Sequence, residues 1–242
     1  MRSLVSALLG LVLLSGCQCL CHECGSGWES LFDGNTLDGW EVRCKREDQD
    51  KSFWRVEDGA IVCDTAGNRD HDYVWLMTTA EFDDFELVLE VQSYADCPGN
   101  SGVQVRSRYD DAAQWLDGPQ VDIHPPTPWR TGYLYDETRG TRRWIHPSLP
   151  DSGIVREQVP GPQSWRHAGE GDGWNEIRIV CEGTRIQTFI NGTPVADYDG
   201  AGLLDDAAHQ QYRVGRTGHI ALQLHIRDDL TMRYRNLRIR KR

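Results

Sequence analysis

Hydrophobic and polar residues alternate with a period of two along most of the chain. In the run 85–91, Phe85, Leu87, Leu89 and Val91 occupy every second position, and glutamates stand at two of the positions between them. Successive side chains of a β-strand point to opposite faces, so this run predicts a half-buried strand. Similar runs occupy 53–57, 60–63, 177–181, 184–190, 194–198, 220–226 and 232–239.

Turn residues separate these runs. Asp58-Gly59 and Asn191-Gly192 each lie between two neighbouring runs, and both pairs are typical of tight β-hairpin turns. Short strands at regular intervals, without a long amphipathic helix, predict an all-β fold: a two-sheet antiparallel jelly-roll sandwich. The segment 124–174 is rich in Pro, Gly, Trp and Arg and is too long for a plain connection, so we expect one long functional loop insertion there.

Three predicted strands, in 100–106, 118–124 and 132–139, carry polar residues at every second position. Residues i, i+2 and i+4 of a strand share a face, so these polar side chains project together, with valine and isoleucine on the opposite face. A row of amide, carboxylate and imidazole groups suits a polar cleft; a solvated outer face is the alternative for any one strand. The rows are Gln104 and Arg106 on the first strand and Gln120, Asp122 and His124 on the second.

The N-terminus has the pattern of a bacterial lipoprotein signal peptide. Arg2 precedes an apolar run, 4–14, that is too short to span a bilayer. The sequence Leu14-Ser15-Gly16-Cys17 then resembles a lipobox. We therefore expect residues 1–16 to be cleaved.

Cleavage would make Cys17 the first residue and the point of lipidation, which anchors the protein to a membrane. Residues 17–27 would form a Cys-rich tether, and 28–242 one β-sandwich domain. Gln18 favours the periplasmic side of the outer membrane within the bacterial cell envelope. An ordinary secretory peptide, which would give a secreted protein, is the alternative.

The amino-acid composition indicates which classes of partner molecule the protein could bind. A formal net charge of −11 argues against nucleic acid, and nine tryptophans with eight tyrosines fit a sugar-binding protein. Four cysteines are spread through the domain and could form two disulfides in an oxidising envelope, by three connectivities. A bond between Cys44 and Cys63 is favoured because both lie on early strands.

A series of short motifs spans the domain in a fixed order. They are the segment Trp28–Trp40, Asn100-Ser101-Gly102 through Arg106, Gln120-Val121-Asp122-Ile123, Leu134-Tyr135-Asp136-Glu137, Trp174-Asn175, Asn191-Gly192, 218–225 and 233–239. Together they resemble the 3-keto-disaccharide hydrolase family, long catalogued as a domain of unknown function. The resemblance implies a concanavalin-A-like jelly roll whose concave face binds carbohydrate, and hydrolysis of 3-keto-glycosides or disaccharides. Many members carry Glu-x-Gln where this chain has Gln120-Val121-Asp122.

Related jelly-roll glucanases place two glutamates at i and i+4 of one strand, but here Gln120 stands at the first position and cannot be an oxygen nucleophile. A 3-keto sugar offers another route. Its ketone acidifies the proton on C2, a base removes that proton, the glycosidic oxygen leaves C1 with help from an acid, and water adds back. This route needs a base, an acid and a cationic or hydrogen-bonding group near the enolate.

The chain offers candidates for each role. Asp122 is the expected base, because desolvation in mid-strand would raise its pKa into a useful range, and His225 is the alternative base or the acid. Glu137 is a second candidate acid, or else an ion-pair partner of Arg139. Arg106 would stabilise the enolate or bind hydroxyls. The further substrate-binding candidates are Gln104, Gln120, Tyr135, Gln223 and Trp129, with Trp144 as an alternative stacking ring.

Structural roles compete with these chemical ones. Asp122 could accept hydrogen bonds from a loop, and Arg106 could be a buried salt-bridge residue. His225 could be a histidine of the inner face whose ring nitrogens are hydrogen-bonded within the protein. The motifs specify no cofactor. The sequence is compatible with a divalent metal ion held by two of Asp122, Glu137 and His225. It is also compatible with a structural calcium ion at a loop.

Two functions of different classes follow. The first is an envelope-anchored hydrolase of 3-keto-glycosides, and the second is a non-catalytic, lectin-like carbohydrate-binding lipoprotein; a purely structural envelope protein comes third. An enzyme should gather Arg106, Asp122 and His225 around one enclosed pocket. A binding module should present aromatic rings on an open groove.

Overall fold

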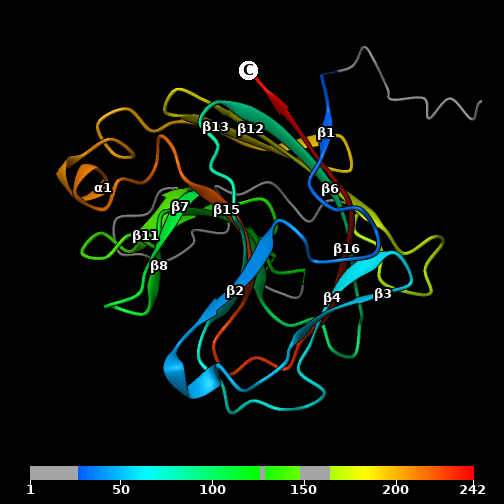
Figure 1. Ribbon diagram of the computed structural model, residues 1–242. Helices are drawn as coiled ribbons and strands as arrows, with labels where there is room; N and C mark the ends of the chain where they lie inside the picture. Colours follow the sequence, from blue (N-terminus) through cyan, green and yellow to red (C-terminus); the bar gives the residue numbers. More distant parts are fainter. Residues whose placement is uncertain (1–26, 126–128, 148–163) are drawn as a thin grey trace, which may run out of the picture.

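A computed structural model describes residues 27–125, 129–147 and 164–242. Within these ranges the strands form two antiparallel sheets of eight strands each, which pack face to face (Figure 1). This is the predicted jelly-roll sandwich. The predicted signal peptide and Cys17 lie outside the described residues. No helix in the described ranges is long and apolar enough to cross a membrane.

Sheet one has the order β14-β13-β12-β6-β16-β4-β3, and β1 pairs with β16. Its strands are β1 (Glu29–Ser30), β3 (Trp54–Glu57), β4 (Ala60–Asp64), β6 (Phe85–Ser93), β12 (Asn175–Glu182), β13 (Arg185–Ile190), β14 (Thr193–Asp199) and β16 (Thr231–Lys241). The two predicted hairpins are confirmed. Asp58-Gly59 joins β3 to β4, and Asn191-Gly192 joins β13 to β14.

Sheet two has the order β11-β10-β9-β7-β15-β5-β2, and β8 pairs with β7. Its strands are β2 (Trp40–Cys44), β5 (Val74–Thr78), β7 (Ser101–Asp110), β8 (Trp115–Asp117), β9 (Pro119–Ile123), β10 (Leu134–Asp136), β11 (Arg143–His146) and β15 (His219–Leu224). A 3₁₀ turn, η1 (Arg46–Asp48), follows β2, and the short helix α1 (Ala207–Tyr212) precedes β15.

The segment 124–174 is not all loop. It contributes β10 and β11, which extend sheet two beyond β9. Leu134 and Ile145 on these strands are buried in the core, so the segment contributes hydrophobic contacts that a plain loop lacks.

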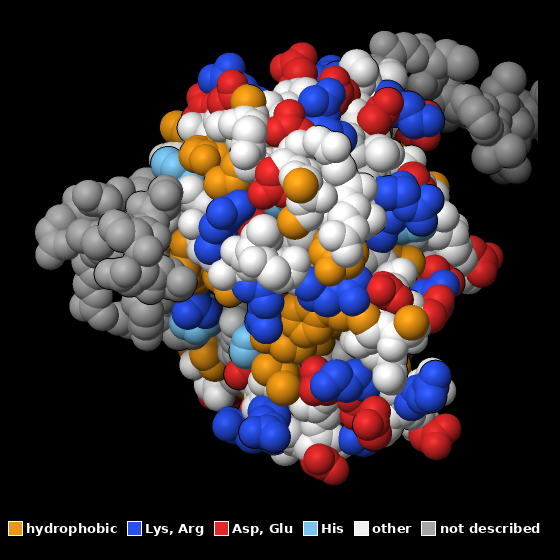
Figure 2. Space-filling model, turned by 90° about the vertical axis from the view of Figure 1, so that its left-hand side faces the viewer, with side chains coloured by type: hydrophobic (Ala, Val, Ile, Leu, Met, Phe, Trp, Pro, Cys, Tyr) orange, Lys and Arg blue, Asp and Glu red, His pale blue; other side chains and the backbone are white. Residues whose placement is uncertain are grey.

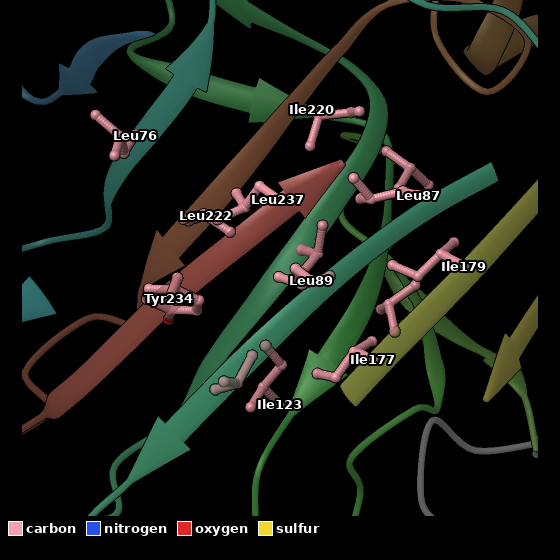
Figure 3. Close-up of a cluster of buried hydrophobic side chains, with 14 of the residues drawn as sticks. Leu76, Leu87, Leu89, Ile123, Ile177, Ile179, Ile220, Leu222, Tyr234 and Leu237 are labelled. Atoms are coloured by element: carbon pink, nitrogen blue, oxygen red, sulfur yellow. The ribbon is translucent and has the colours of Figure 1, made fainter. Parts of the chain in front are cut away.

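The main core lies between the sheets. Figure 3 shows Leu87, Leu89, Ile177 and Ile179 of sheet one and, from sheet two, Leu222 among the buried side chains. The predicted inward set of β6, Phe85 to Val91 at every second residue, is fully buried as expected. The period-two pattern therefore sets the face of each strand.

Sheet two is also covered on its other face. Tyr73, Trp75, Met77, Leu116 and Ala221 form a second buried hydrophobic cluster there. Trp115, Tyr109 and Ile226 pack against it. Side chains on this face of sheet two are thus removed from water even though they lie outside the main core.

The outer face of sheet one is a ladder of ion pairs. Glu86 contacts Arg178, Arg240 and Arg242, and Glu90 contacts Arg235 at 2.6 Å. The glutamates predicted to point outward from β6 thus pair with arginines of the neighbouring strands.

The expected Cys44–Cys63 disulfide is not formed. Cys44 lies on β2 in sheet two and Cys63 on β4 in sheet one, and both are free thiols, as are Cys97 and Cys181. Cys63 and Cys181 are instead fully buried members of the hydrophobic core.

Candidate functional site

A polar pocket of about 220 Å³ opens on the face of sheet two that points away from the main core. Figure 2 views the molecule from the side where β8 and β11 lie in Figure 1, and it shows hydrophobic side chains exposed between lysines and arginines. Strands β9 and β10 and the connections around them supply most of the wall. The lining residues are Tyr73, Asn100, Gln120, Asp122, Arg130, Tyr135, Glu137, Arg142, Trp144 and His225.

Asp122 lies at the base of this pocket on β9, with 2% of its surface exposed. Its neighbours Val121 and Ile123 point into the main core, so strand alternation turns Asp122 to the opposite face. Oδ2 accepts a hydrogen bond from Arg130 Nε at 2.9 Å. Burial raises the pKa of Asp122 to about 6, although Arg130 and His225 oppose that rise.

Glu137 follows the end of β10 and is 4% exposed. Its Oε2 lies 3.4 Å from Arg142 Nε and has no hydrogen-bond partner among the described residues. Burial raises the pKa of Glu137 to about 7; Arg142 lowers it, and the negative charge of Asp122 contributes to the rise. The pocket therefore holds two carboxyl groups that interact with each other.

A row of amides supports Asp122 from behind. The amides of Gln104 and Gln120 lie 2.6 Å apart, and Gln120 donates its Nε2 to Asp122 Oδ1 at 3.2 Å. Gly102 on β7 makes room for this row, because a Cβ there would stand 2.5 Å from the Gln120 side chain. This close approach accounts for the glycine of the Asn-Ser-Gly motif.

His225 follows β15 and faces the pocket with Tyr73 beside it. The Tyr73 hydroxyl lies 3.2 Å from Nε2, and Asp228 Oδ2 lies 3.4 Å from Nδ1. Asp228 also accepts a hydrogen bond from the backbone N–H of Asn100 at 2.9 Å. The three side chains form an Asp–His–Tyr array at one wall.

Cations and aromatic rings form the rim. Arg130 lies over the Trp144 ring at 5.7 Å, and Tyr135 packs edge-on against the same ring at 5.0 Å. Arg142 lies over Trp115 at 4.7 Å. The opening thus presents flat rings together with positive charge.

Arg106 lies outside the pocket, contrary to the sequence-based expectation. Its φ of 52° and a register shift between β7 and β15 mark a bulge, which turns the side chain away from the polar row. The guanidinium is fully buried and donates to the carbonyl oxygens of Asp83, Gly183 and Gly215 and to the Asp84 carboxylate. Arg106 therefore has the structural role given above as the alternative to substrate binding, that of a buried salt-bridge residue.

Three other predicted contacts also lie elsewhere. Gln104 and Gln223 are fully buried, with their amides 2.9 Å apart, so Gln104 reaches the pocket only through Gln120. Trp129 packs against the main core and meets Trp165 edge-on at 5.7 Å. Alternation along a strand gives the face of a residue but not the neighbours that cover it.

Of the predicted residues, five line one pocket: Asp122, Glu137, His225, Gln120 and Tyr135. Trp144, the alternative stacking ring, lines it as well. Sequence reasoning did not assign roles to Tyr73, Asn100, Arg130, Arg142 and Asp228. Asn100 opens a motif already noted, and Asp228 stands three residues after His225. The remaining three come from connections, whose position no periodicity reveals.

A buried histidine holds β10 in place beneath the site. His209 of α1 is fully buried, with Nε2 3.3 Å from Asp136 and Nδ1 2.8 Å from Asp206. The pKa of His209 is raised: burial opposes its charge, but hydrogen bonds and charge interactions with Asp136 and Asp206 outweigh that effect. Asp136, adjacent to Glu137, is thus a structural anchor.

The acidic partner of Arg139 is not Glu137. Arg139 contacts Asp117 at 2.7 Å and Asp110 at 2.8 Å, away from the pocket. Within the described ranges, no group of three or more His, Cys, Asp or Glu side chains could hold a metal ion.

The fold and pocket define a jelly-roll protein with a buried acidic site on one sheet. The chain belongs to the family described as the 3-keto-alpha-glucoside-1,2-lyase-like domain, whose profile matches residues 27–240. A comparison with curated proteins gives no match.

Solved structures share this fold. A candidate glycosyl hydrolase from Parabacteroides distasonis is 18% identical, with a TM-score of 0.56 over 89% of this chain and 94% of that one. A second from the same organism is 23% identical, with a TM-score of 0.52 over 89% and 99%. The exoplasmic/lumenal domain of VIP36, solved with Ca²⁺ and Man3GlcNAc bound, is 10% identical, with a TM-score of 0.54 over 88% of each chain.

The His209 anchor predicts a pH-dependent stability. The pKa of folded His209 lies above the value of 6.5 for an ordinary histidine. Its ionic stabilisation is therefore fully present below pH 6.5 and is lost as the pH rises through the folded-state pKa. We expect His209→Gln to lower the free energy of unfolding by about 3 kcal/mol at pH 6, and by less at pH 9.

Urea unfolding at the two pH values measures this difference. His146→Gln is the matched control, because burial lowers the pKa of His146 and it holds no such charge. An equal loss at both pH values for His209→Gln would show that the ionic contacts contribute nothing.

Proposed function

We propose that the pocket cleaves glycosides that carry a 3-keto sugar, by elimination across C1 and C2 followed by hydration. The observation that carries this proposal is the pair of buried carboxyl groups, Asp122 and Glu137, with pKa values of about 6 and about 7 in one pocket. Two titratable groups with different pKa values at the same site suit a base and an acid. The family of the chain supports the substrate class.

In this proposal Asp122 is the base. Its carboxylate takes the C2 proton, and the electron pair of the broken C–H bond forms the C2–C3 double bond while the ketone oxygen becomes negative. The enolate then collapses to the ketone, its electron pair forms the C1–C2 double bond as the C1–oxygen bond breaks, and protonated Glu137 supplies its proton to the leaving oxygen. Water then adds to C1 and gives its proton to Glu137, and Asp122 returns a proton to C2, so the 3-keto sugar is released and both carboxyl groups regain their starting states.

The pocket size and rim fit one sugar ring. A volume of about 220 Å³ is below the roughly 300–1,000 Å³ typical of sites that enclose drug-sized ligands. The keto sugar would enter the pocket, with the leaving group towards the opening. Trp144 and Tyr135 offer ring faces for stacking, and Gln120 and Arg130 offer donors to hydroxyl groups.

We also propose that the domain is anchored in the bacterial envelope through a lipid on Cys17. The N-terminal pattern carries this proposal. The described chain begins beside sheet one, where Trp28 lies against Arg240 and β1 pairs with β16. A tether leaving from sheet one would keep the pocket of sheet two free.

The proposed elimination predicts which substrates the protein cleaves. The domain without residues 1–27 should release the aglycone from 4-nitrophenyl 3-keto-α-glucoside but not from its unoxidised parent. Asp122→Asn should lower kcat at least about 100-fold, because the base is lost. Asp111→Asn, at an exposed carboxylate, is the matched control and should leave the rate unchanged.

Assays with and without a chelator would test whether a divalent ion contributes. Equal activity on the keto compound and its parent would contradict the elimination route. Saturable sugar binding with no release from either compound would assign the lectin-like function instead.

The second prediction is a narrow pH optimum. Activity should fall below about pH 6 as Asp122 becomes protonated, and above about pH 7 as Glu137 loses its proton. The value of kcat/KM should therefore peak between these limits. Glu137→Gln should lower kcat and remove the alkaline limb, whereas Glu90→Gln, on the outer face of sheet one, should change neither. A flat profile from pH 5 to 9 would exclude both assignments.

The third prediction concerns the anchor. Full-length protein expressed in a Gram-negative host should fractionate with membranes and incorporate a labelled fatty acid. Cys17→Ser should abolish both, since the thiol that carries the lipid is removed. Labelling that persists in this variant would refute lipidation at Cys17.

A further inference from the structure

The proposed elimination needs a donor for the enolate oxygen. When C2 loses its proton, negative charge develops on the C3 oxygen, and a fixed hydrogen-bond donor aimed at that position lowers the barrier. Arg106, the sequence-based candidate, is buried elsewhere against the Asp83, Gly183 and Gly215 carbonyls and Asp84. The donor must therefore come from the pocket lining.

Tyr73 is a firmly held donor in the pocket lining. Its ring stacks on Trp75 with centroids 5.6 Å apart, and it meets the edges of Trp115 and His225 at 5.2 and 5.0 Å. Only 8% of its surface is exposed. Arg142, the other donor beside Glu137, has 47% of its side chain exposed and is less constrained.

The polar contacts of Tyr73 hold its hydroxyl at the pocket wall, between His225 and Arg142. The hydroxyl lies 3.2 Å from His225 Nε2, and Asp228 orients the ring from the Nδ1 side at 3.4 Å. The phenolic hydrogen rotates about the C–O bond, so it can turn from Nε2 towards an oxygen atom in the pocket. His71 fixes the two supporting segments, because its ring nitrogens contact the carbonyl oxygens of Asp72 and Asp228.

We propose that Tyr73 is a catalytic residue that donates a hydrogen bond to the C3 oxygen of the enolate, with His225 and Asp228 as positioning residues. This inference rests on the proposed elimination. The C2 proton moves to Asp122, the electron pair moves through C2–C3 to the ketone oxygen, and Tyr73 keeps its proton throughout. No oxidant or reductant is needed.

The environment of Tyr73 suits a donor that does not ionise. Burial raises the pKa of Tyr73 to about 12, so the phenol stays protonated across the working pH range. A neutral donor stabilises the new negative charge without adding a positive charge beside Asp122, which would make Asp122 a weaker base. The hydrophobic cluster around the ring excludes water, and exclusion of water strengthens the hydrogen bond.

Tyr73→Phe tests this role, with Tyr109→Phe as the matched control. Tyr109 belongs to the same aromatic cluster, but its hydroxyl donates to the carbonyl oxygen of Cys44 at 2.6 Å, outside the pocket. Release from 4-nitrophenyl 3-keto-α-glucoside would be measured with hydrogen and with deuterium at C2. Thermal melting of both variants would show that each is folded.

We expect Tyr73→Phe to lower kcat about 100-fold, the scale of a lost oxyanion donor, with KM changed less than threefold. The C2 isotope effect should be at least as large as in the parent protein, because proton removal is the step that slows. Tyr109→Phe should keep kcat within about threefold.

Two results would overturn the assignment while leaving the elimination standing. One is a kcat for Tyr73→Phe within threefold of Tyr109→Phe, and the other is a slowed reaction whose C2 isotope effect has vanished. Failure of the parent protein to cleave the keto substrate at all would overturn the proposed elimination, and the role of Tyr73 with it.

Discussion

The chemistry of the site depends on the burial of sheet two on both faces. One face packs on sheet one, and the other carries the aromatic cluster around Trp75 and Leu116. Because β9 places Val121 and Ile123 in the core, its polar side chains must project from the opposite face, beside the second hydrophobic cluster, where little water reaches them. On an ordinary solvated sheet face, Asp122 would have an unremarkable acidity. Here the loss of water keeps its pKa near neutrality.

The same burial imposes a cost that neighbouring groups offset. A buried carboxylate is unfavourable unless charges and hydrogen bonds replace its water shell. Arg130 and the amide row from Gln104 through Gln120 do this for Asp122, and Arg142 does so less completely for Glu137. The incompleteness at Glu137 agrees with its raised pKa and leaves Oε2 without a hydrogen-bond partner among the described residues. The contacts of Asp122 and Glu137 therefore affect both the stability of the protein and the reactivity of the two carboxyl groups.

Much of this arrangement could be predicted from the chain alone. Alternation gave the sandwich, both hairpins and the faces of Gln120 and Asp122, since a period of two is a direct consequence of strand geometry. It failed at Arg106, where one bulged residue reverses the face. It could not find Tyr73 or Arg142, which reach the pocket from a strand end and a connection more than 60 residues apart in the sequence. The Cys44–Cys63 pairing was wrong because strand order along the chain does not tell which sheet a strand joins.

The arginine–glutamate ladder on the outer face of sheet one has a practical consequence. Glu86, Glu90 and their arginines are satisfied among themselves, and none of them lines the pocket. The two broad faces of the molecule are therefore chemically independent. A dye, an affinity handle or a solid support attached through outward positions of β16 would leave the pocket of sheet two open to its ligand.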